Sequence, residues 1–264
     1  MQTGSEPRVA FFIPGVQKGG TTALDELLRQ HPAIAMARGK EAHFFDKDTL
    51  DWDRPDYGPY HQRYPSADQG ERLRGDATPI YLYWPRALER IAAYNPAARF
   101  IVCLRHPAHR AWSQWLMESV RGKEPLPFAD AIREPGRRRL AGTANGAHPI
   151  FSYVERGLYG GQLERLLGLF PREAVSFVRT DSLWRDPSGV VQRLHGFLGL
   201  EPRPVQAQPR YVSIPPSGGG QPIAEAEQAY LTALFADEIR RTAALSGLDL
   251  ADWLDPAYRE PMAP

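Results

Sequence analysis

Cysteine is almost absent from this sequence, which has one, Cys103, among 264 residues. A single cysteine excludes an internal disulfide and a metal site held by several thiolates. Because Cys103 lies inside the apolar run 100–104, we interpret it as a small buried hydrophobic side chain. His106 and His109 stand three residues apart, but no further ligands cluster nearby, so the sequence predicts no metal site.

Long hydrophobic segments are also missing. No stretch approaches the roughly 20 apolar residues of a membrane-spanning helix, and residues 1–8 lack the apolar core of a signal peptide. Charge of one sign is not in excess, because 32 Lys and Arg against 31 Asp and Glu leave a net charge of +1. This balance gives no reason to expect nucleic acid or a membrane as a partner. We therefore expect a cytoplasmic protein in which any anion-binding site is local.

The length favours one domain. A chain of 264 residues suffices for one large α/β domain and is short for two independent ones, so we predict a single domain over residues 1–264. Three segments rich in Pro, Gly, Asp or Arg are expected to be long surface loops of the kind that act as lids or binding loops. These segments are residues 46–70, 121–149 and 201–222.

Short apolar runs alternate with helical patterns along the chain. Runs that are apolar on both faces are typical of buried parallel strands, and we expect strands at residues 9–13, 100–104 and 175–178. The helical patterns have apolar residues three or four apart, and the expected helices begin near Thr21, at Pro107, at Pro187 and at Ala224. This alternation predicts an α/β fold in which a parallel β-sheet is flanked by helices.

A glycine-rich loop, residues 15–22, joins the first expected strand to the first expected helix. Glycines there let backbone N–H groups close around an anion, and the helix N-terminus adds partial positive charge. The spacing of Gly15 and Gly20 matches the start of a nucleotide-binding P-loop, but Thr21 stands where that loop has its lysine. The lysine of this loop is Lys18 instead. A simple glycine-rich turn is the alternative, but the strand, Lys18 and two threonines favour a P-loop-like phosphate site.

Arg105 directly follows the second expected strand. Ligands of open α/β sheets bind at the carboxyl edge of the strands, so Arg105 is a candidate phosphate ligand, although a surface ion pair is the commoner use of such an arginine. A kinase would need a magnesium-binding carboxylate to bridge its phosphates. The sequence therefore favours a phosphate site that uses Lys and Arg over a P-loop nucleotide kinase.

These motifs resemble those of the PAPS-dependent sulfotransferases (PAPS is 3′-phosphoadenosine 5′-phosphosulfate), in particular the heparan-sulfate-type branch and its bacterial relatives. Residues 12–24 resemble the 5′-phosphosulfate loop, and residues 40–46, KEAHFFD, resemble the Lys-Glu-x-His-Phe-Phe-Asp signature. Arg105, with Ser113 eight residues later, resembles the 3′-phosphate motif. Residues 75–81 and 153–159 are also similar to family segments. The motifs follow the family order over about residues 9–200.

The resemblance implies a role for each matched residue. Lys18 would contact the oxygen that bridges sulfate and 5′-phosphate and would stabilise the charge of the leaving group. Arg105 and Ser113 would bind the 3′-phosphate. Glu41 would be the general base, and His43 would help hold the sulfuryl group. The residues that would bind the 5′-phosphate are Gly19, Gly20, Thr21 and Thr22.

The chemistry of sulfuryl transfer agrees with these roles. The reaction is an in-line displacement, so a protein must align donor and acceptor and stabilise charge on the leaving oxygen. A hydroxyl attacks better when a carboxylate takes its proton. If residues 40–46 are extended, alternation places Glu41 and His43 on one face, where both can reach one centre. From the spacing alone, a solvated surface carboxylate is the better explanation of Glu41 and a packed core histidine is the better explanation of His43; the phosphate loop and the resemblance favour the site.

The sequence departs from the family at two places. Ala77 stands near a position where some glycosaminoglycan-modifying members carry a lysine, which makes a heparan-like acceptor less expected. Many members close the 3′-phosphate site with a basic glycine-rich loop. In the comparable region here, we assign this role to Arg210, the nearest basic residue, and to the glycines around Gly219.

The sequence thus predicts a sulfotransferase that moves a sulfuryl group from PAPS to a hydroxyl or amine of a small-molecule, sugar or natural-product acceptor, releases adenosine 3′,5′-bisphosphate and requires no metal. A nucleotide kinase would need the lysine that Thr21 replaces, and a non-catalytic nucleotide-binding module would have no need of a base such as Glu41. Aromatic residues in the 46–70 segment either stack on the acceptor or pack the loop down; they are Trp52, Tyr57, Tyr60 and Tyr64.

Overall fold

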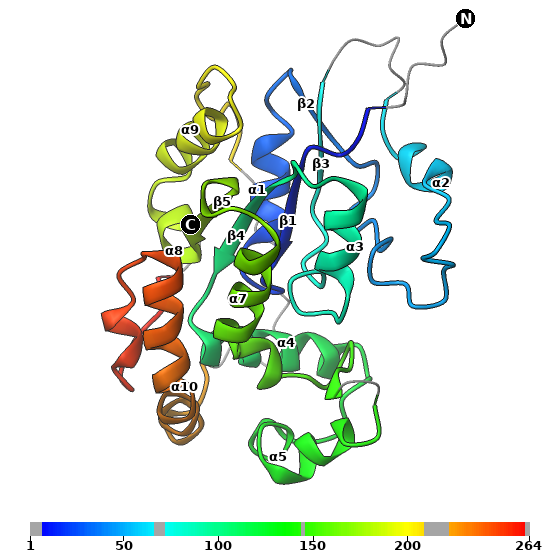
Figure 1. Cartoon of the computed structure of the whole chain (residues 1–264). Helices are drawn as coiled ribbons and strands as arrows, with labels where there is room; N and C mark the ends of the chain where they lie inside the picture. The colour runs from blue at the N-terminus through cyan, green and yellow to red at the C-terminus, as the bar shows by residue number, and fades with distance from the viewer. Residues whose placement is uncertain (1–6, 66–71, 144–145, 209–221, 262–264) are drawn as a thin grey trace, which may run out of the picture.

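The structure is a computed structural model and describes residues 7–65, 72–143, 146–208 and 222–261. Five parallel strands form one sheet in the order β2-β3-β1-β4-β5 (Figure 1). The strands are β1 (Phe11–Gly15), β2 (Ile34–Met36), β3 (Leu73–Asp76), β4 (Arg99–Leu104) and β5 (Val175–Arg179). This is the predicted parallel α/β architecture.

Helices cover both faces of the sheet. Successive side chains of a strand point to opposite faces, so Phe12 packs into one core cluster while Phe11 and Ile13 pack into the other. The Phe12 face is covered by α3 (Ala87–Tyr94), α4 (Pro107–Val120), α7 (Tyr159–Leu169) and α10 (Glu225–Ser246). The opposite face is covered by α1 (Thr21–Leu28), α8 (Thr180–Arg185) and α9 (Pro187–Phe197). Among the described helices, none has the length and hydropathy of a membrane span.

The three strands expected from apolar runs are confirmed, although β1 begins two residues later than expected, at Phe11, and runs to Gly15. Pro107 is the first residue of α4, as its lack of an N–H group favours. Strands β2 and β3, of three and four residues, were not predicted from the sequence. β3 also carries two buried charged side chains: Arg74 donates to the backbone oxygens of Pro7 and Pro65, and Asp76 accepts from Tyr60 and Tyr81. With the sequence LRGD, β3 contains no apolar run, and its charged side chains can be buried only because these hydrogen-bond partners are present.

The aromatic residues of segment 46–70 pack that segment onto the core. Tyr60 and Tyr64 are 1 % and 3 % exposed, and Tyr60 stacks on Phe44 with 4.9 Å between ring centroids. Trp52 lies against Phe45 at 5.9 Å. Tyr60 and Tyr64 are therefore structural and not available to stack on an acceptor, whereas Trp52 and Tyr57 pack on the core but remain partly exposed. The described residues of the segment, 46–65, include the short helix α2 (Gly58–His61).

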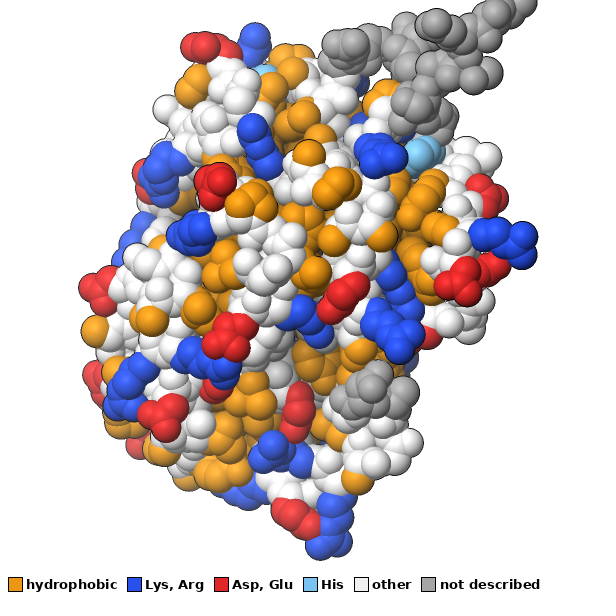
Figure 2. Space-filling model, in the orientation of Figure 1, with side chains coloured by type: hydrophobic (Ala, Val, Ile, Leu, Met, Phe, Trp, Pro, Cys, Tyr) orange, Lys and Arg blue, Asp and Glu red, His pale blue; other side chains and the backbone are white. Residues whose placement is uncertain are grey.

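Within its described residues, segment 121–149 contains the one-turn helices α5 (Phe128–Ala131) and α6 (Glu134–Arg137) and a 3-10 turn at Arg138–Leu140, while residues 144–145 lie outside the described part. In segment 201–222, residues 209–221 lie outside the described part of the chain, and so do Arg210 and Gly219. On the face shown in Figure 2, basic and acidic side chains are interspersed, in keeping with the near-zero net charge.

Candidate active site

The loop between β1 and α1 packs tightly against the carboxyl end of β4. The Val16 N–H donates to the Cys103 carbonyl at 2.9 Å, and a Cβ at Gly19 would lie 2.8 Å from that same oxygen. Only glycine fits at that approach. The first intrahelical bond of α1 joins Leu24 N–H to Gly20 C=O at 3.0 Å. The N–H groups of residues 21–23 therefore have no partner within the helix and can bind an anion.

Two lysines bring positive charge to this helix end. Lys18, at φ 68° in the loop, has its Nζ 3.8 Å from Met117 Sδ of α4. Burial, reinforced by the charges of Arg105, Arg121 and Lys40, lowers the pKa of Lys18 to about 8. Lys40 Nζ donates to Thr21 Oγ1 at 3.2 Å and Thr22 Oγ1 at 2.9 Å. Such crowding of like charges favours binding of an anion, which would relieve the repulsion.

Arg105 stands at the carboxyl end of β4, as the sequence predicted. Its Nη1 donates to the Lys18 carbonyl at 2.8 Å, so the arginine is tied to the phosphate loop. Ser113 lies half-buried on α4, one turn before Met117, and these two residues share the helix face that reaches Lys18. Within the described part of the chain, Ser113 Oγ forms no hydrogen bond.

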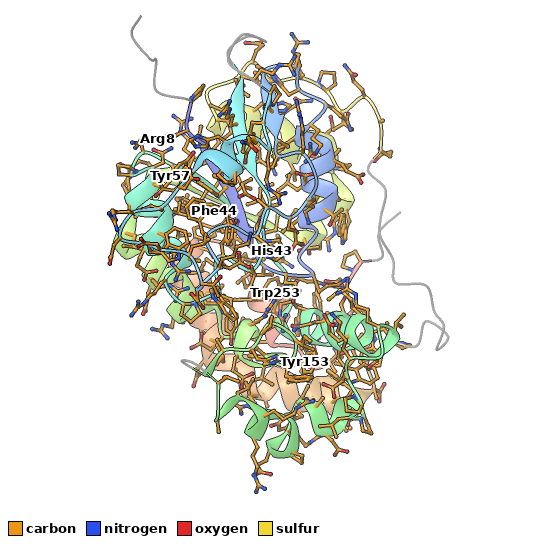
Figure 3. All side chains as sticks on the ribbon, turned by 90° about the vertical axis from the view of Figure 1, so that its right-hand side faces the viewer. Arg8, His43, Phe44, Tyr57, Tyr153 and Trp253 are labelled. Atoms are coloured by element: carbon orange, nitrogen blue, oxygen red, sulfur yellow. The ribbon has the colours of Figure 1, made fainter. Side chains whose placement is uncertain are left out.

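Glu41 and His43 do come together, but by a different route from the one predicted. The segment is not extended, because His43 has a left-handed backbone with φ 48°. This turn places His43 Nε2 3.2 Å from Glu41 Oε2 and His43 Nδ1 2.7 Å from Asp46 Oδ2. The expectation of strand-like alternation was wrong, whereas the proximity is confirmed. Figure 3 shows His43 near the middle of the molecule, with Phe44 and Tyr57 above it and Tyr153 below.

The charge states of this cluster follow from its contacts. Hydrogen bonds to Asp46 and then Glu41 raise the pKa of His43 to about 10. Burial pushes the pKa of Glu41 upward, but His43, Lys40 and Arg156 together outweigh burial and hold that pKa below its ordinary value. At neutral pH Glu41 is therefore ionised and able to accept a proton, while His43 is an imidazolium that can pair with negative oxygens but cannot serve as a base.

We expect His43 to remain protonated well above neutral pH, and Asp46→Asn to move its pKa back toward the ordinary 6.5, because Asp46 is the largest cause of the shift. NMR titration of the His43 ring measures this, with the exposed Asp53→Asn as control. The pKa of His43 is higher in the folded than in the unfolded chain. The contacts of the imidazolium with Asp46 and Glu41 therefore stabilise the fold fully below about pH 6.5, and this stabilisation is lost as the pH rises toward about 10. A parent His43 that titrates near 6.5 would contradict the assigned ion cluster.

Three residues of the site were missed by the sequence analysis: Lys40, Asp46 and Arg156. Lys40 connects the phosphate loop to the Glu41–His43 pair. Its Nζ donates to the hydroxyls of the two loop threonines and lies 3.7 Å from Glu41 Oε1. Arg156 is 3 % exposed and donates to Gln17 Oε1 of the phosphate loop at 2.5 Å and to the Pro149 carbonyl at 2.9 Å. All three lie inside segments that resemble family motifs, residues 40–46 and 153–159, and this resemblance could have identified them from the sequence.

His106 and His109 have structural surroundings. His106 Nε2 lies 3.0 Å from the Trp253 carbonyl, and its ring stacks on Tyr258. Burial lowers the pKa of both histidines. Within the ranges that the structure describes, no three His, Cys, Asp or Glu side chains are grouped as metal ligands are.

Comparison with known proteins identifies the family. The family model described as "Sulfotransferase domain" matches residues 9–214, which include the phosphate loop, the Glu41–His43 pair and Arg105. The chain belongs to the sulfotransferase family. The family resemblance is thereby confirmed. The match favours a sulfotransferase over the alternative of a P-loop nucleotide kinase.

Relatives of this sulfotransferase include eukaryotic enzymes named for heparan sulfate. It is 33% identical over 204 residues to heparan sulfate glucosamine 3-O-sulfotransferase 3A1 of Mus musculus, covering 76% of this chain and 48% of that protein. It is 35% identical over 193 residues to the 3-O-sulfotransferase 6 of Homo sapiens, covering 72% and 52%. The chain thus spans about half the length of the curated relatives it matches.

Solved structures give a similar result. A sulfotransferase from Alicyclobacillus acidocaldarius has 30% identity and a TM-score of 0.74, covering 94% of this chain and 100% of that one. A sulfotransferase domain from the Synechococcus PCC 7002 olefin synthase shares the fold, with a TM-score of 0.54, 16% identity and coverage of 95% and 98%. The Alicyclobacillus acidocaldarius structure supports both the family and the fold over nearly the whole chain.

Proposed function

We propose that this sulfotransferase transfers the sulfuryl group of PAPS to a hydroxyl or amine of a small-molecule or carbohydrate acceptor, with Glu41 as general base. The observation that carries the proposal is the position of Lys40. It bonds the threonines at the anion-binding end of α1 and lies 3.7 Å from the ionised Glu41. A binding module has no use for a base at that place.

The residues present fit the donor. The first-turn N–H groups of α1, the hydroxyls of Thr21 and Thr22, and Lys40 supply hydrogen-bond donors for a 5′-phosphate. Burial, and then the charges of Arg105, Arg121 and Lys40, lower the pKa of Lys18, and an anion bound beside Lys18 would stabilise its charged form. Arg105 bonds the loop through the Lys18 carbonyl, and Ser113 lies on α4 one turn before Met117, which contacts Lys18. We assign these two residues to the 3′-phosphate of the same nucleotide.

Each residue then has one task in an in-line displacement. Glu41 removes the proton of the acceptor hydroxyl as the acceptor oxygen forms its bond to sulfur. The bond between sulfur and the 5′-phosphate oxygen breaks, and its electron pair stays on that oxygen. Lys18 stabilises the charge that appears there, and the His43 imidazolium pairs with oxygens of the sulfuryl group. Proton, sulfuryl group and electron pair are thereby all accounted for.

We further propose that the acceptor is not recognised in the manner of heparan sulfate. Ala77 is 3 % exposed and takes part in an apolar core cluster, so it contributes no charge to an acceptor site. Incubation with labelled PAPS and panels of sugars, phenols, lipids and peptidic natural products would identify the acceptor. Adding EDTA to this assay separates sulfuryl transfer from a metal-dependent kinase reaction.

The donor assignment predicts that the parent binds adenosine 3′,5′-bisphosphate roughly 10- to 150-fold more tightly than AMP, since a charge-assisted contact is worth about 1.5–3 kcal/mol. Arg105→Ala should abolish most of this preference, and the exposed Arg193→Ala should preserve it. Calorimetry with both nucleotides measures the ratio. Equal affinities in the parent would remove Arg105 from the nucleotide site and weaken the proposal.

A further inference from the structure

The segment that follows α10 returns to the carboxyl edge of the sheet. Trp253 is 1 % exposed, and its carbonyl lies 3.0 Å from His106 Nε2. The Tyr258 ring lies parallel to that of His106, with 4.8 Å between centroids and 10° between planes. Gln228 of α10 donates to the Pro256 and Tyr258 carbonyls at 2.9 and 2.7 Å. The segment is therefore anchored up to Tyr258, beside the start of α4.

Two residues beyond this anchor, Glu260 binds Arg105. Arg105 Nε lies 2.8 and 2.9 Å from the two carboxylate oxygens of Glu260, and Nη2 donates to the second of them. The side chains are 20% and 12% exposed, so the pair is largely shielded from water. Since Arg105 Nη1 donates to the Lys18 carbonyl, the Nε–Nη2 edge is the one a ligand would use. Glu260 occupies that edge.

We propose that Glu260 is an intramolecular competitor for the 3′-phosphate, so that nucleotide binding requires Arg105 to exchange the Glu260 carboxylate for the phosphate. This inference rests on the proposed function, in which Arg105 binds that phosphate. The planar fork of an arginine accepts two oxygens of a carboxylate or of a phosphate in the same way, so the two anions compete for one edge. A carboxylate left in place would also repel the phosphate at short range.

The exchange has two consequences. The apparent nucleotide affinity is reduced by the fraction of molecules in which Arg105 is bound to Glu260. The same carboxylate can rebind Arg105 as the product nucleotide leaves, which shortens the lifetime of the product complex. Because Glu260 lies beyond the Tyr258 anchor, it can leave Arg105 without disturbing the packed Trp253. The pair is a reversible latch, and its opening does not unfold the core.

Glu260→Gln removes the charge and keeps the shape of the side chain. Calorimetry should show that this variant binds adenosine 3′,5′-bisphosphate roughly tenfold more tightly than the parent, equivalent to about 1.4 kcal/mol, with AMP affinity unchanged. The matched control is Glu225→Gln, because Glu225 faces Arg259 of the same segment at 3.6 Å and is 92% exposed. The control should bind both nucleotides as the parent does. In an Arg105→Ala background, Glu260→Gln should change neither affinity by more than about twofold.

The outcomes separate the latch from the donor assignment. Suppose the parent prefers the bisphosphate over AMP and Arg105→Ala removes that preference, yet Glu260→Gln binds the bisphosphate like the parent. Glu260 is then only a structural partner, and the latch is wrong while the donor assignment stands. A fall in melting temperature without tighter binding would likewise make Glu260 a structural partner only. If neither the parent nor Glu260→Gln prefers the bisphosphate over AMP, the donor assignment is wrong and the latch is wrong with it.

Discussion

Replacing Glu41 by glutamine is expected to lower kcat by roughly 10²–10⁴-fold while leaving donor affinity near that of the parent. Glutamine keeps the size of the side chain and can still contact His43, but its amide cannot take a proton. The contacts with His43 and Lys40 hold Glu41 ionised in the parent, so the proton acceptor is present at neutral pH. The loss therefore falls on the chemical step.

The size of the defect should depend on the acceptor. A phenol loses its proton more easily than an aliphatic alcohol and needs the base less, so the ratio of parent to variant rates should shrink with a phenol. Rates are measured with labelled PAPS, and donor binding by calorimetry. Glu173→Gln, on the exposed turn before β5 at the amino end of the strands, is the matched control.

An alcohol acceptor that Glu41→Gln converts at near the parent rate would show that Glu41 is not the base. His43 could not then replace it at neutral pH, because its raised pKa keeps it protonated. The base would have to be sought elsewhere in the site. The family assignment would be untouched, because it rests on the match over residues 9–214.

Lys18→Ala is expected to lower kcat by roughly 10²–10³-fold, the usual cost of removing one donor that stabilises a developing anion. The dissociation constant of the donor should rise less, by about tenfold at most. The variant keeps Lys40, Arg105 and the α1 N–H groups, which still bind the donor in the ground state. An interaction made mainly in the transition state appears in kcat.

The pH profile gives an independent signature of Lys18. Its pKa near 8 in the free enzyme predicts that kcat/KM of the parent falls as the pH rises above about 8. This limb should be missing in Lys18→Ala and present in Lys47→Ala, in which an exposed lysine is removed. A variant that loses donor affinity but keeps its kcat would make Lys18 a ground-state ligand only.

The sequence alone determined the α/β class and the strand–loop–helix at the anion site. β1 and residues 100–104 of β4 are mostly apolar and fully buried, β5 buries Val175 and Val178, and Pro107 can begin a helix but cannot continue one. Gly20 of the loop had a local reason too, since its φ of 87° is a left-handed backbone conformation that glycine adopts without strain. Signals of this kind are contained in a few consecutive residues.

Only the tertiary structure decided the rest, because the partners come from distant parts of the chain. β3 is a strand despite Arg74 and Asp76, whose buried charges are satisfied by groups from other segments. The left-handed turn at His43, not an extended strand, pairs it with Glu41. Glu260 meets Arg105 across 155 residues of sequence. No local pattern encodes such a contact, since its free energy depends on the burial and charge that folding itself creates.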